Sequence, residues 1–205
     1  SDRRCLMSSE VKANKLSPSS GTALQISDSG DTTTIPSGAT LAIASGATIA
    51  NSGTQTGFGL FSSYAIIADQ KSQNTAGGTF TLGAWRTRDL NTEIADPDGI
   101  VSISSNQFTL GAGSYLIRWV TITYNVYGNQ SRVYNITDAS VEGISQSNYG
   151  IYGNFPWGTI RMTIAGSKTF EIQHKCIDTI ATDGFGKAAN IGTEQYCTVE
   201  IFKEA

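Results

Sequence analysis

The longest apolar run in the chain is Tyr115–Val126, and β-branched and aromatic residues dominate it. Such side chains favour an extended strand over a helix, because they pack well on a pleated surface. Alternation puts Val120 and Ile122 on one face of this run and Ile117 and Trp119 on the other. Since both faces are apolar, we expect both to have packing partners, as in a central strand of a β-sandwich.

Eight other segments between residues 62 and 205 are short and have turn-forming residues between them. They are Tyr64–Asp69, Thr79–Leu82, Ile100–Ser104, Arg132–Thr137, Ser140–Ser145, Thr159–Ile164, Thr169–Ile177 and Gln195–Lys203. About nine strands in a block of this length are typical of a single all-β domain. We therefore predict a β-sandwich or jelly roll.

The composition agrees with a protein of strands and turns. Charged residues make up 15% of the chain and 22 of its 205 residues are glycine, which is a poor composition for a helical bundle. The net charge is -3 without any cluster of Lys and Arg, so we expect no nucleic-acid partner. No apolar run reaches the roughly 18 residues of a transmembrane helix. We expect neither membrane insertion nor a signal peptide.

Residues that carry chemistry are few. The chain has one histidine and three cysteines, with no recognisable metal-ligand spacing. It also lacks a nucleophile elbow and a phosphate-binding glycine motif in the right context. We therefore predict that the protein is not an enzyme and that it has no cofactor and no metal site.

The segment Thr169–Ile177 places Phe170, Ile172, His174 and Cys176 on one face. On such a face His174 is interpreted as a core histidine, hydrogen-bonded to a neighbour, rather than as a ligand or a base. Cys176 and Cys197 are interpreted as buried free thiols. They could also lie on neighbouring strands, and their pairing is left open.

The only tight acidic cluster is Asp96–Gly99, with the sequence Asp-Pro-Asp-Gly. This tetrapeptide is a strong turn signal and it stands just before a predicted strand. Two carboxylates so close together could instead bind Ca²⁺ or act as a pair in catalysis. We predict a turn, and we leave open whether Asp96 and Asp98 bind an ion.

A short repeat precedes the β-domain. Ile35–Leu41 and Ile43–Ile49 are nearly identical, and each contains a Ser-Gly pair followed by alternating apolar positions. Glycine supplies the positive φ that such turns require. A rung this short cannot bury its own apolar face, so lateral association of several chains would close the core. The alternative is a flexible Ser/Gly/Thr linker.

The chain therefore divides into three parts. Residues 1–19 form a polar arm without a hydrophobic period, which needs a partner to lie against. Residues 20–61 form the repeat segment, with Gly57–Gly59 resembling a hinge, and residues 62–205 form the β-domain. We expect the arm to anchor the protein to a partner.

One loop concentrates groups that suit recognition. Residues 146–158 carry Asn148, Tyr149, Tyr152 and Trp157 among glycines. Exposed aromatic rings beside amides are typical of sugar-binding and protein-binding loops, since rings offer large contact area at small entropy cost. We take these four residues as the candidate receptor-contact loop. The alternative is that Phe155 and Trp157 pack beneath the loop.

The block from Phe108 to Ile117 resembles the signature of the C1q/TNF-like jelly-roll superfamily. Phe108, Gly113, Tyr115 and Ile117 match its spacing, although the family's proline before the glycine is missing. The segment Cys197–Ala205 looks like that family's last strand. This resemblance implies a jelly-roll head that assembles as a homotrimer.

A second resemblance covers most of the chain. Four segments look like parts of fibre or decoration proteins of tailed bacteriophages, notably those of cyanobacteria. They are the opening around residues 11–17, the stretch beginning Ile26-Ser-Asp-Ser-Gly, the Ser-Gly-Ala-Thr repeats and the stretch Trp85–Glu93. In such proteins an arm attaches to the virion, a stalk trimerises and a head faces outward.

The second resemblance implies a homotrimeric structural protein at the virion surface, made in the host cytoplasm. Its arm would contact other virion proteins, and its head would bind a host cell-surface glycan or protein. The alternative is a capsid decoration or head-fibre protein, and attachment to tail or to capsid is left open. A glycan-degrading tailspike would need a carboxyl pair at defined separation, and the few acidic residues give no convincing pair.

Overall fold

The computed structural model describes residue 26, residues 29–48 and residues 60–205. The chain forms two compact units, Ser1–Ser52 and Gly53–Ala205, and each is described by itself. The polar arm, Cys5, the resemblance around residues 11–17 and the Gly57–Gly59 hinge lie outside the described residues.

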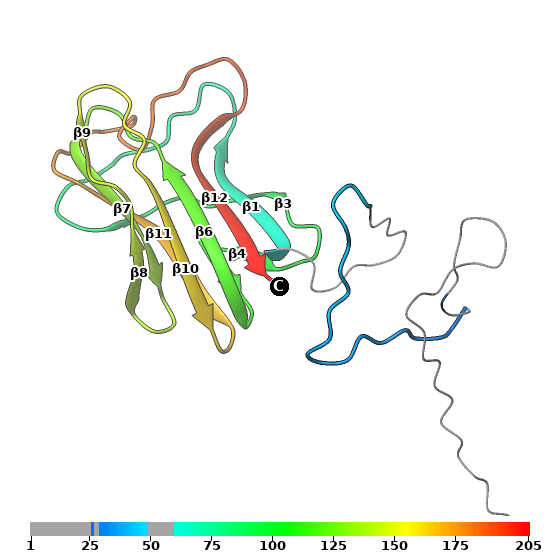
Figure 1. The fold of residues 1–205 in the computed structure, drawn as a ribbon. Coiled ribbons are helices and arrows are strands. Elements are labelled where there is room, and N and C mark those ends of the chain that lie inside the picture. The colour runs from blue at the N-terminus through cyan, green and yellow to red at the C-terminus, as the bar shows by residue number, and fades with distance from the viewer. Residues whose placement is uncertain (1–25, 27–28, 49–59) are drawn as a thin grey trace, which may run out of the picture. The chain divides into compact units, whose positions relative to one another are not determined.

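The second unit consists of β-strands, and its described residues contain no helix (Figure 1). The strands are β1 (Phe61–Lys71), β2 (Arg86–Thr87), β3 (Thr92–Ala95), β4 (Val101–Ser104), β5 (Gln107–Leu110), β6 (Gly113–Thr121), β7 (Tyr127–Asn135), β8 (Ser140–Ile144), β9 (Asn148–Gly150), β10 (Trp157–Ile164), β11 (Lys168–Cys176) and β12 (Glu194–Glu204). The all-β prediction is confirmed.

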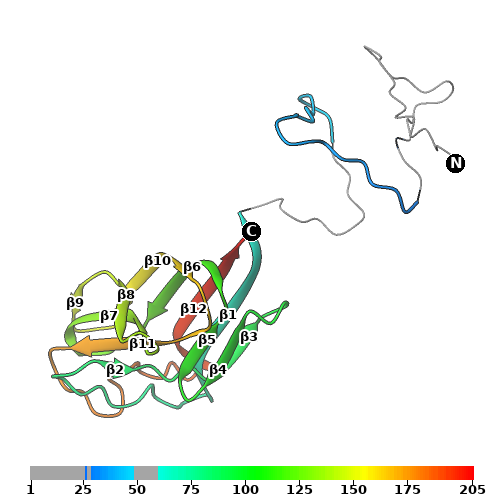
Figure 2. The ribbon, with the colours of Figure 1, turned by 90° about the horizontal axis from the view of Figure 1, so that it is seen from below.

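The strands form two antiparallel sheets. A five-stranded sheet has the order β10-β6-β12-β1-β3, and a seven-stranded sheet has the order β4-β5-β11-β7-β8, with β2 pairing β11 and β9 pairing β7. Figure 2 shows the two layers, with β10 and β6 in one and β11 and β2 in the other. Strands distant in sequence are neighbours in both sheets, so the domain is a crossed-over sandwich of the jelly-roll type.

The core lies between the two sheets. Tyr115, Ile117 and Trp119 of β6 point inward and meet Phe170 and Ile172 of β11 within one buried cluster. A polar bond crosses this core, where the indole N–H of Trp119 donates to Ser131 Oγ on β7 at 2.9 Å. On β11 alternation predicted the buried face correctly, because successive side chains of a strand point to opposite faces.

The run Tyr115–Val126 is shorter as a strand than its composition suggests. β6 ends at Thr121, whose N–H donates to the carbonyl of Pro156, and Asn125 has a positive φ of 58°. Its second face is also not packed inside the chain, since Leu116, Arg118 and Val120 lie at the surface of the sheet. The expectation of two packed faces is wrong for the single chain.

The predicted strand Thr79–Leu82 is not formed. Only Phe80 makes a bridge, to Ile180, and its ring is buried against His174 and Phe185. Gly78 and Gly83 on either side have positive φ values of 112° and 94°, which interrupt an extended strand. The predicted strands Arg132–Thr137 and Ser140–Ser145 correspond to β7 and β8, which pair as an antiparallel hairpin.

The repeat segment contains a regular series of turns. Turns occur at 29–30, 37–38 and 45–46, and their glycines have φ values of 93°, 83° and 83°. The N–H of Ala39 bonds the carbonyl of Pro36, and that of Ala47 bonds the carbonyl of Ala44, both at 3.0 Å. A glycine with positive φ in the third position is typical of a type II turn. Within residues 29–48 no strand forms, and the apolar side chains of Ile35, Leu41 and Ile43 are exposed.

Candidate functional site

The four residues of the predicted receptor-contact loop belong to β9, to β10 and to the connection between these strands. Asn148 and Tyr149 lie in β9, which pairs with β7 in the seven-stranded sheet. Tyr152 follows in the connection to β10 and is 79% exposed, and Trp157 begins β10 in the five-stranded sheet and is 45% exposed. Phe155 is also exposed, so the alternative in which Phe155 and Trp157 pack beneath the loop does not hold. Asn148 and Tyr149 are thus placed together, and Trp157 belongs to the other sheet.

Asn148 and Tyr149 line a surface pocket of about 440 Å³, which we call the Trp85 pocket. Strands β7, β9 and β11 supply most of its wall, and Trp85 is the residue directly before β2. Its lining residues are Trp85, Gly128, Asn129, Gln130, Ser147, Asn148, Tyr149, Lys175, Cys176 and Ile177. This lining combines aromatic rings, amides and one ammonium group, and it includes no carboxylate.

Gly128 of β7 determines how closely the pocket wall packs. A Cβ built on this residue would lie 3.1 Å from Ile177 Cδ1 and 3.3 Å from Tyr149 Cδ2. Such distances are shorter than ordinary van der Waals contacts, so any larger residue would displace Tyr149 or Ile177.

Some polar groups of the pocket are already used by the fold. Asn129 bonds the His174 ring through Oδ1 at 3.1 Å and donates through Nδ2 to the carbonyl of Tyr127. Gln130 Nε2 donates to the carbonyl of Ser145 at 3.0 Å. These bonds hold the floor of the pocket rigid.

Other polar groups remain available. Among the described residues, the amide of Asn148, the ammonium of Lys175 and the indole N–H of Trp85 have no hydrogen-bond or ion-pair partner. Lys175 is exposed at the end of β11, where its charge is accessible from solvent. The pocket therefore offers an amide, a cation and a ring donor to a ligand.

The Trp85 ring is held in place from one side. The guanidinium carbon of Arg132 lies 4.1 Å from the centre of this ring and 4.8 Å from the centre of Tyr134. Arg132 is itself held by Gln173, whose side-chain oxygen accepts from Nε at 2.9 Å and from Nη2 at 2.7 Å. Burial lowers the pKa of Arg132, while Tyr134 acts in the opposite direction. An ordered cation–π stack of this kind fixes the orientation of the indole.

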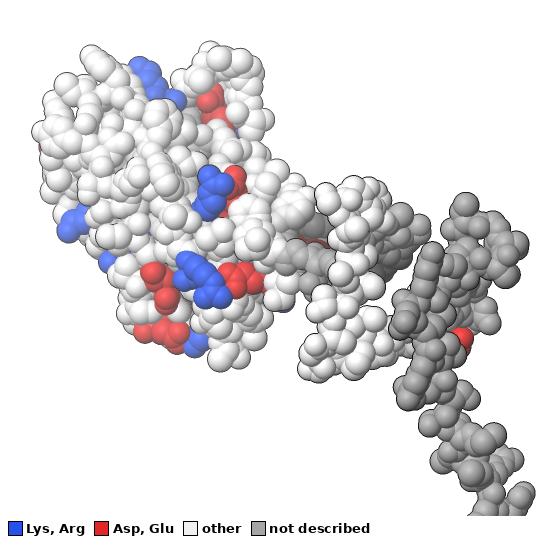
Figure 3. Space-filling model, in the orientation of Figure 1, with Lys and Arg blue, Asp and Glu red and all other residues white. Residues whose placement is uncertain are grey.

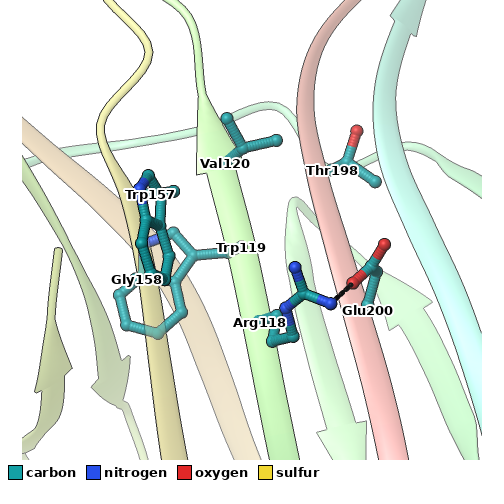
Figure 4. Close-up of a pocket in the computed structure, with 7 residues that line it drawn as sticks. All are labelled: Arg118, Trp119, Val120, Trp157, Gly158, Thr198 and Glu200. Atoms are coloured by element: carbon teal, nitrogen blue, oxygen red, sulfur yellow. Dashed lines mark ion pairs between the residues drawn. The ribbon is translucent and has the colours of Figure 1, made fainter.

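A second, smaller hollow of about 110 Å³ lies on the other sheet. Figure 4 shows that Trp157 and Arg118 line it from the neighbouring strands β10 and β6, with Glu200 of β12 beyond. Arg118 Nη1 lies 3.4 Å from Glu200 Oε2. This hollow is part of the outer face of the five-stranded sheet.

That outer face carries an apolar stripe. Residues that are directly paired across strands share a face of the sheet, and the pairing Tyr64 to Phe202 to Leu116 crosses three strands. The outward-facing apolar side chains are Tyr64, Ile66, Leu116, Val120, Trp157 and Phe202. Figure 3 shows mostly uncharged surface with places where basic and acidic atoms touch. Ion pairs on this face join Arg118 to Glu200 and Arg161 to Glu204.

The outer face of the seven-stranded sheet is different. Its central strands present Gln130, Arg132, Gln173 and Lys175. Glu171, on the same strand, accepts from Thr87 Oγ1 at 2.8 Å. One face of the sandwich is thus partly apolar, and the opposite face is polar and carries the Trp85 pocket.

His174 is a core residue, as its pattern predicted. It is fully buried, and its Nε2 and Asn129 Oδ1 lie 3.1 Å apart, whereas Nδ1 has no hydrogen-bond partner. Burial lowers the pKa of His174 well below its ordinary value, and the positive charge of Arg88 lowers it further. The imidazole is therefore neutral at physiological pH.

The tetrapeptide Asp96–Gly99 forms the predicted turn. The Asp96 carboxylate accepts the N–H groups of Ile100 at 2.8 Å and Val101 at 3.0 Å, and Asp98 accepts from Ser63 Oγ at 2.6 Å. Both carboxylates are thus used in local hydrogen bonds at the start of β4.

Cys176 and Cys197 are buried free thiols. Within the described part of the chain, no group of three or more His, Cys, Asp or Glu side chains could hold a metal ion. Nor does any helix among the described residues have the length and apolar character needed to span a membrane.

Of the residues that line the Trp85 pocket, only Asn148 and Tyr149 were predicted from the sequence as site residues. Trp85 directly precedes β2, Lys175 lies near the end of β11 and Ile177 directly follows β11, so all three are distant from Asn148 along the chain. The local signal in the sequence is a tryptophan near two arginines, in Trp85–Arg88. Their meeting depends on the pairing of β11 with β2 and β7.

The chain was compared with known families, proteins and structures. No protein-family model matches the chain, and no curated protein matches it. Among solved structures, the chain is similar to Eiger TNF from S. frugiperda, with 12% identity and a TM-score of 0.47 over 71% of this chain and 94% of that one. It is also similar to the globular domain of zebrafish complement 1qA, with 12% identity and a TM-score of 0.43 over 68% of this chain and 95% of that one. A third is the PRD1 vertex protein P5, with 16% identity and a TM-score of 0.44 over 72% of this chain and 100% of that one.

Proposed function

We propose that the protein is a homotrimeric, non-enzymatic structural protein of a tailed-phage virion, whose sandwich domain binds the host surface. The sequence resemblance to phage fibre proteins suggests the setting. The observation that carries the proposal is the difference between the two outer faces of the sandwich. One face exposes an apolar stripe and the other is polar and holds a pocket.

The apolar stripe is proposed to pack against two further copies of this chain. Leu116, Val120 and Phe202 expose apolar area on a flat sheet, and ordered apolar patches are typical of contacts between subunits. The repeat segment supports the same occupant, because the apolar side chains of Ile35, Leu41 and Ile43 recur beside similar turns and are exposed. Three chains side by side would bury both sets.

The division of labour follows from this assembly. Residues 1–19 are proposed to anchor the trimer to other virion proteins, residues 20–61 to form the stalk and residues 62–205 to form the outward head. The polar face of the seven-stranded sheet then points away from the trimer contacts and meets the host cell-surface glycan or protein. The protein would be made in the host cytoplasm and located on the virion surface.

A matched pair of valine substitutions tests the trimer. Val120→Glu places a charge in the apolar stripe, and Val141→Glu places the same charge on exposed β8 of the other sheet. Light scattering of the full chain should give three times the chain mass for the wild type and for Val141→Glu, and a smaller assembly for Val120→Glu. A wild-type monomer at micromolar concentration would contradict the proposal.

The location and the role in attachment need separate measurements. Antibody labelling of intact virions should find the protein on the outer surface, and purified trimer should adsorb to host cells. A chain without residues 1–19 should still form a cooperatively melting head but should not enter particles. Surface labelling of capsid faces without any adsorption would instead favour the decoration role.

A further inference from the structure

We propose that the Trp85 pocket binds an anionic saccharide, with a carboxylated sugar ring stacked on Trp85 and its carboxylate paired with Lys175. This inference rests on the proposed function, in which the polar face of the head meets the host surface. It names the chemical class of the receptor and the residues that recognise it.

The size of the pocket suits a sugar. Its volume of about 440 Å³ falls in the range of roughly 300–1000 Å³ typical of small-molecule sites. The pocket is open to solvent along the β9 side, where Tyr149 is 73% exposed. A terminal or branching sugar of a longer glycan could enter from this side while the rest of the chain remains outside.

The aromatic groups provide the apolar contact. Trp85 is half-buried and held by Arg132, so its ring loses little freedom when a ligand stacks on it. Tyr149 contributes a second ring on the far wall, 6.0 Å from the ring of Tyr127. Fixed rings of this kind favour the C–H faces of a pyranose, because the contact area comes at small entropic cost.

The polar groups select the charge of the ligand. Asn148 offers a free amide donor and acceptor for hydroxyl groups. Lys175 offers a positive charge, and no Asp or Glu lines the pocket to neutralise it. A neutral sugar would leave this ammonium unpaired, whereas a carboxylate would satisfy it with a charge-assisted hydrogen bond. The chemistry therefore favours an acidic sugar over a neutral one.

The same arguments set this pocket apart from the hollow at Trp157. There the cation Arg118 is already paired with Glu200, and the hollow has only about a quarter of the volume, about 110 Å³ against about 440 Å³. Trp157 also lies in the apolar stripe proposed for subunit contact. Of the residues in the predicted receptor-contact loop, Asn148 and Tyr149 are therefore the ones assigned to the glycan.

The test is a glycan array that carries carboxylated and neutral oligosaccharides, including trigalacturonate and its methyl ester. The array is probed with the full chain. Binding of carboxylated glycans at least tenfold tighter than of matched neutral ones is expected. Lys175→Met should remove this preference, and Trp85→Ala should weaken carboxylated glycans about tenfold or more. Lys187→Met is the matched control, because Lys187 is another exposed lysine beside an aromatic ring, 5.0 Å from the centre of Tyr124.

Three outcomes are distinguishable. Loss of carboxylated-glycan binding in Lys175→Met with retention in Lys187→Met supports the pocket. The pocket assignment is overturned, while the attachment function stands, if host-cell adsorption is unchanged by Lys175→Met and Trp85→Ala and the array shows no preference for carboxylated glycans. Unchanged adsorption with binding of a peptide only has the same meaning. Specific glycan binding without adsorption to cells overturns the attachment function while the pocket stands. Unchanged melting temperatures of both variants exclude misfolding as the cause.

Discussion

The guanidinium of Arg88 lies 3.6 Å from the carboxylate of Asp69, and both side chains are almost completely enclosed. Arg88 also donates to three backbone carbonyls, those of Ile122 at 3.2 Å, Phe185 at 3.0 Å and Tyr196 at 2.7 Å. Ile122 directly follows β6, Phe185 lies in the loop before β12, and Tyr196 lies near the start of β12. One buried cation thus ties β1 to the loops at one end of the sandwich.

The first prediction concerns this cation. Arg88→Leu would remove one of the two cations beside the buried Asp69 carboxylate, the other being Lys71 at 3.3 Å, and would leave the three carbonyls without this donor. Breaking a buried pair in this way costs about 3–5 kcal/mol of unfolding free energy. Denaturant unfolding of the full chain at one fixed protein concentration measures the loss, since assembly couples stability to concentration.

Arg86→Leu provides the control for Arg88→Leu. Arg86 is exposed on β2, and its side chain makes one bond, from Nε to the carbonyl of Thr81 at 3.3 Å. A surface substitution of this kind should change the unfolding free energy by about 0.5 kcal/mol or less. Equal effects of the two substitutions would show that the buried pair does not hold the loops.

The second prediction uses the single histidine of the chain. Burial holds the pKa of His174 well below its ordinary value, so the folded chain binds no proton there while the unfolded chain does so below about pH 6.5. The stability contributed by the neutral imidazole is present above that pH and is lost as the pH falls, by up to about 1.4 kcal/mol per pH unit. Urea unfolding from pH 8 to 5 should show this slope, and His174→Asn should lack it.

NMR gives an independent check of the histidine prediction. One imidazole signal is expected, and its Cε1–H shift should stay constant between pH 7.5 and 5.5 in the folded protein. A titration with its midpoint near pH 6.5 would mean that His174 is accessible to water and that its burial against Phe80 and Asn129 is incorrect.

The third prediction concerns the close approach of β10 to the Trp119 ring. Gly158 pairs with Trp119, and atoms of the indole occupy the space that a Cβ on Gly158 would need. Gly158→Ala should therefore force the ring aside and lower the unfolding free energy by about 1–3 kcal/mol. Tryptophan emission should shift at the same time.

Gly111→Ala is the matched control, because a Cβ at Gly111 meets no atom within 4 Å and its φ is not in the positive region. This substitution should leave the melting temperature within about one degree or raise it slightly. If Gly158→Ala is equally harmless, the indole has room to move and the packing there is looser than described.

The fourth prediction concerns the thiols. Burial raises the pKa of Cys197 to about 12 and that of Cys176 to about 11, so very few of these thiols are ionised at pH 8. Neither should react with N-ethylmaleimide in the folded protein, and both should react in guanidinium chloride. Peptide mass mapping distinguishes the sites. Rapid labelling of either thiol in the folded protein would contradict its burial.

Local patterns in the sequence were enough to predict the longer strands of the domain, although not β2, β3, β5 and β9. On β11, Phe170, Ile172, His174 and Cys176 point inward as alternation requires. The same is true of the turn at Asp96 and of the turns at Gly38 and Gly46. Each of these features depends on residues within a few positions of one another, where side-chain direction and φ preference act directly.

Contacts between distant segments depend on the tertiary structure. The placement of Tyr149 and Trp157 in different sheets depends on which strands β9 and β10 pair with. The Trp85 pocket likewise forms only where β2, β7 and β9 gather around the end of β11. The sequence by itself determined the all-β composition and the inward faces, because these follow from local periodicity. The order of the strands and the members of the pocket were decided by long-range pairing, in which the burial of one face against another selects among many arrangements that are locally equivalent.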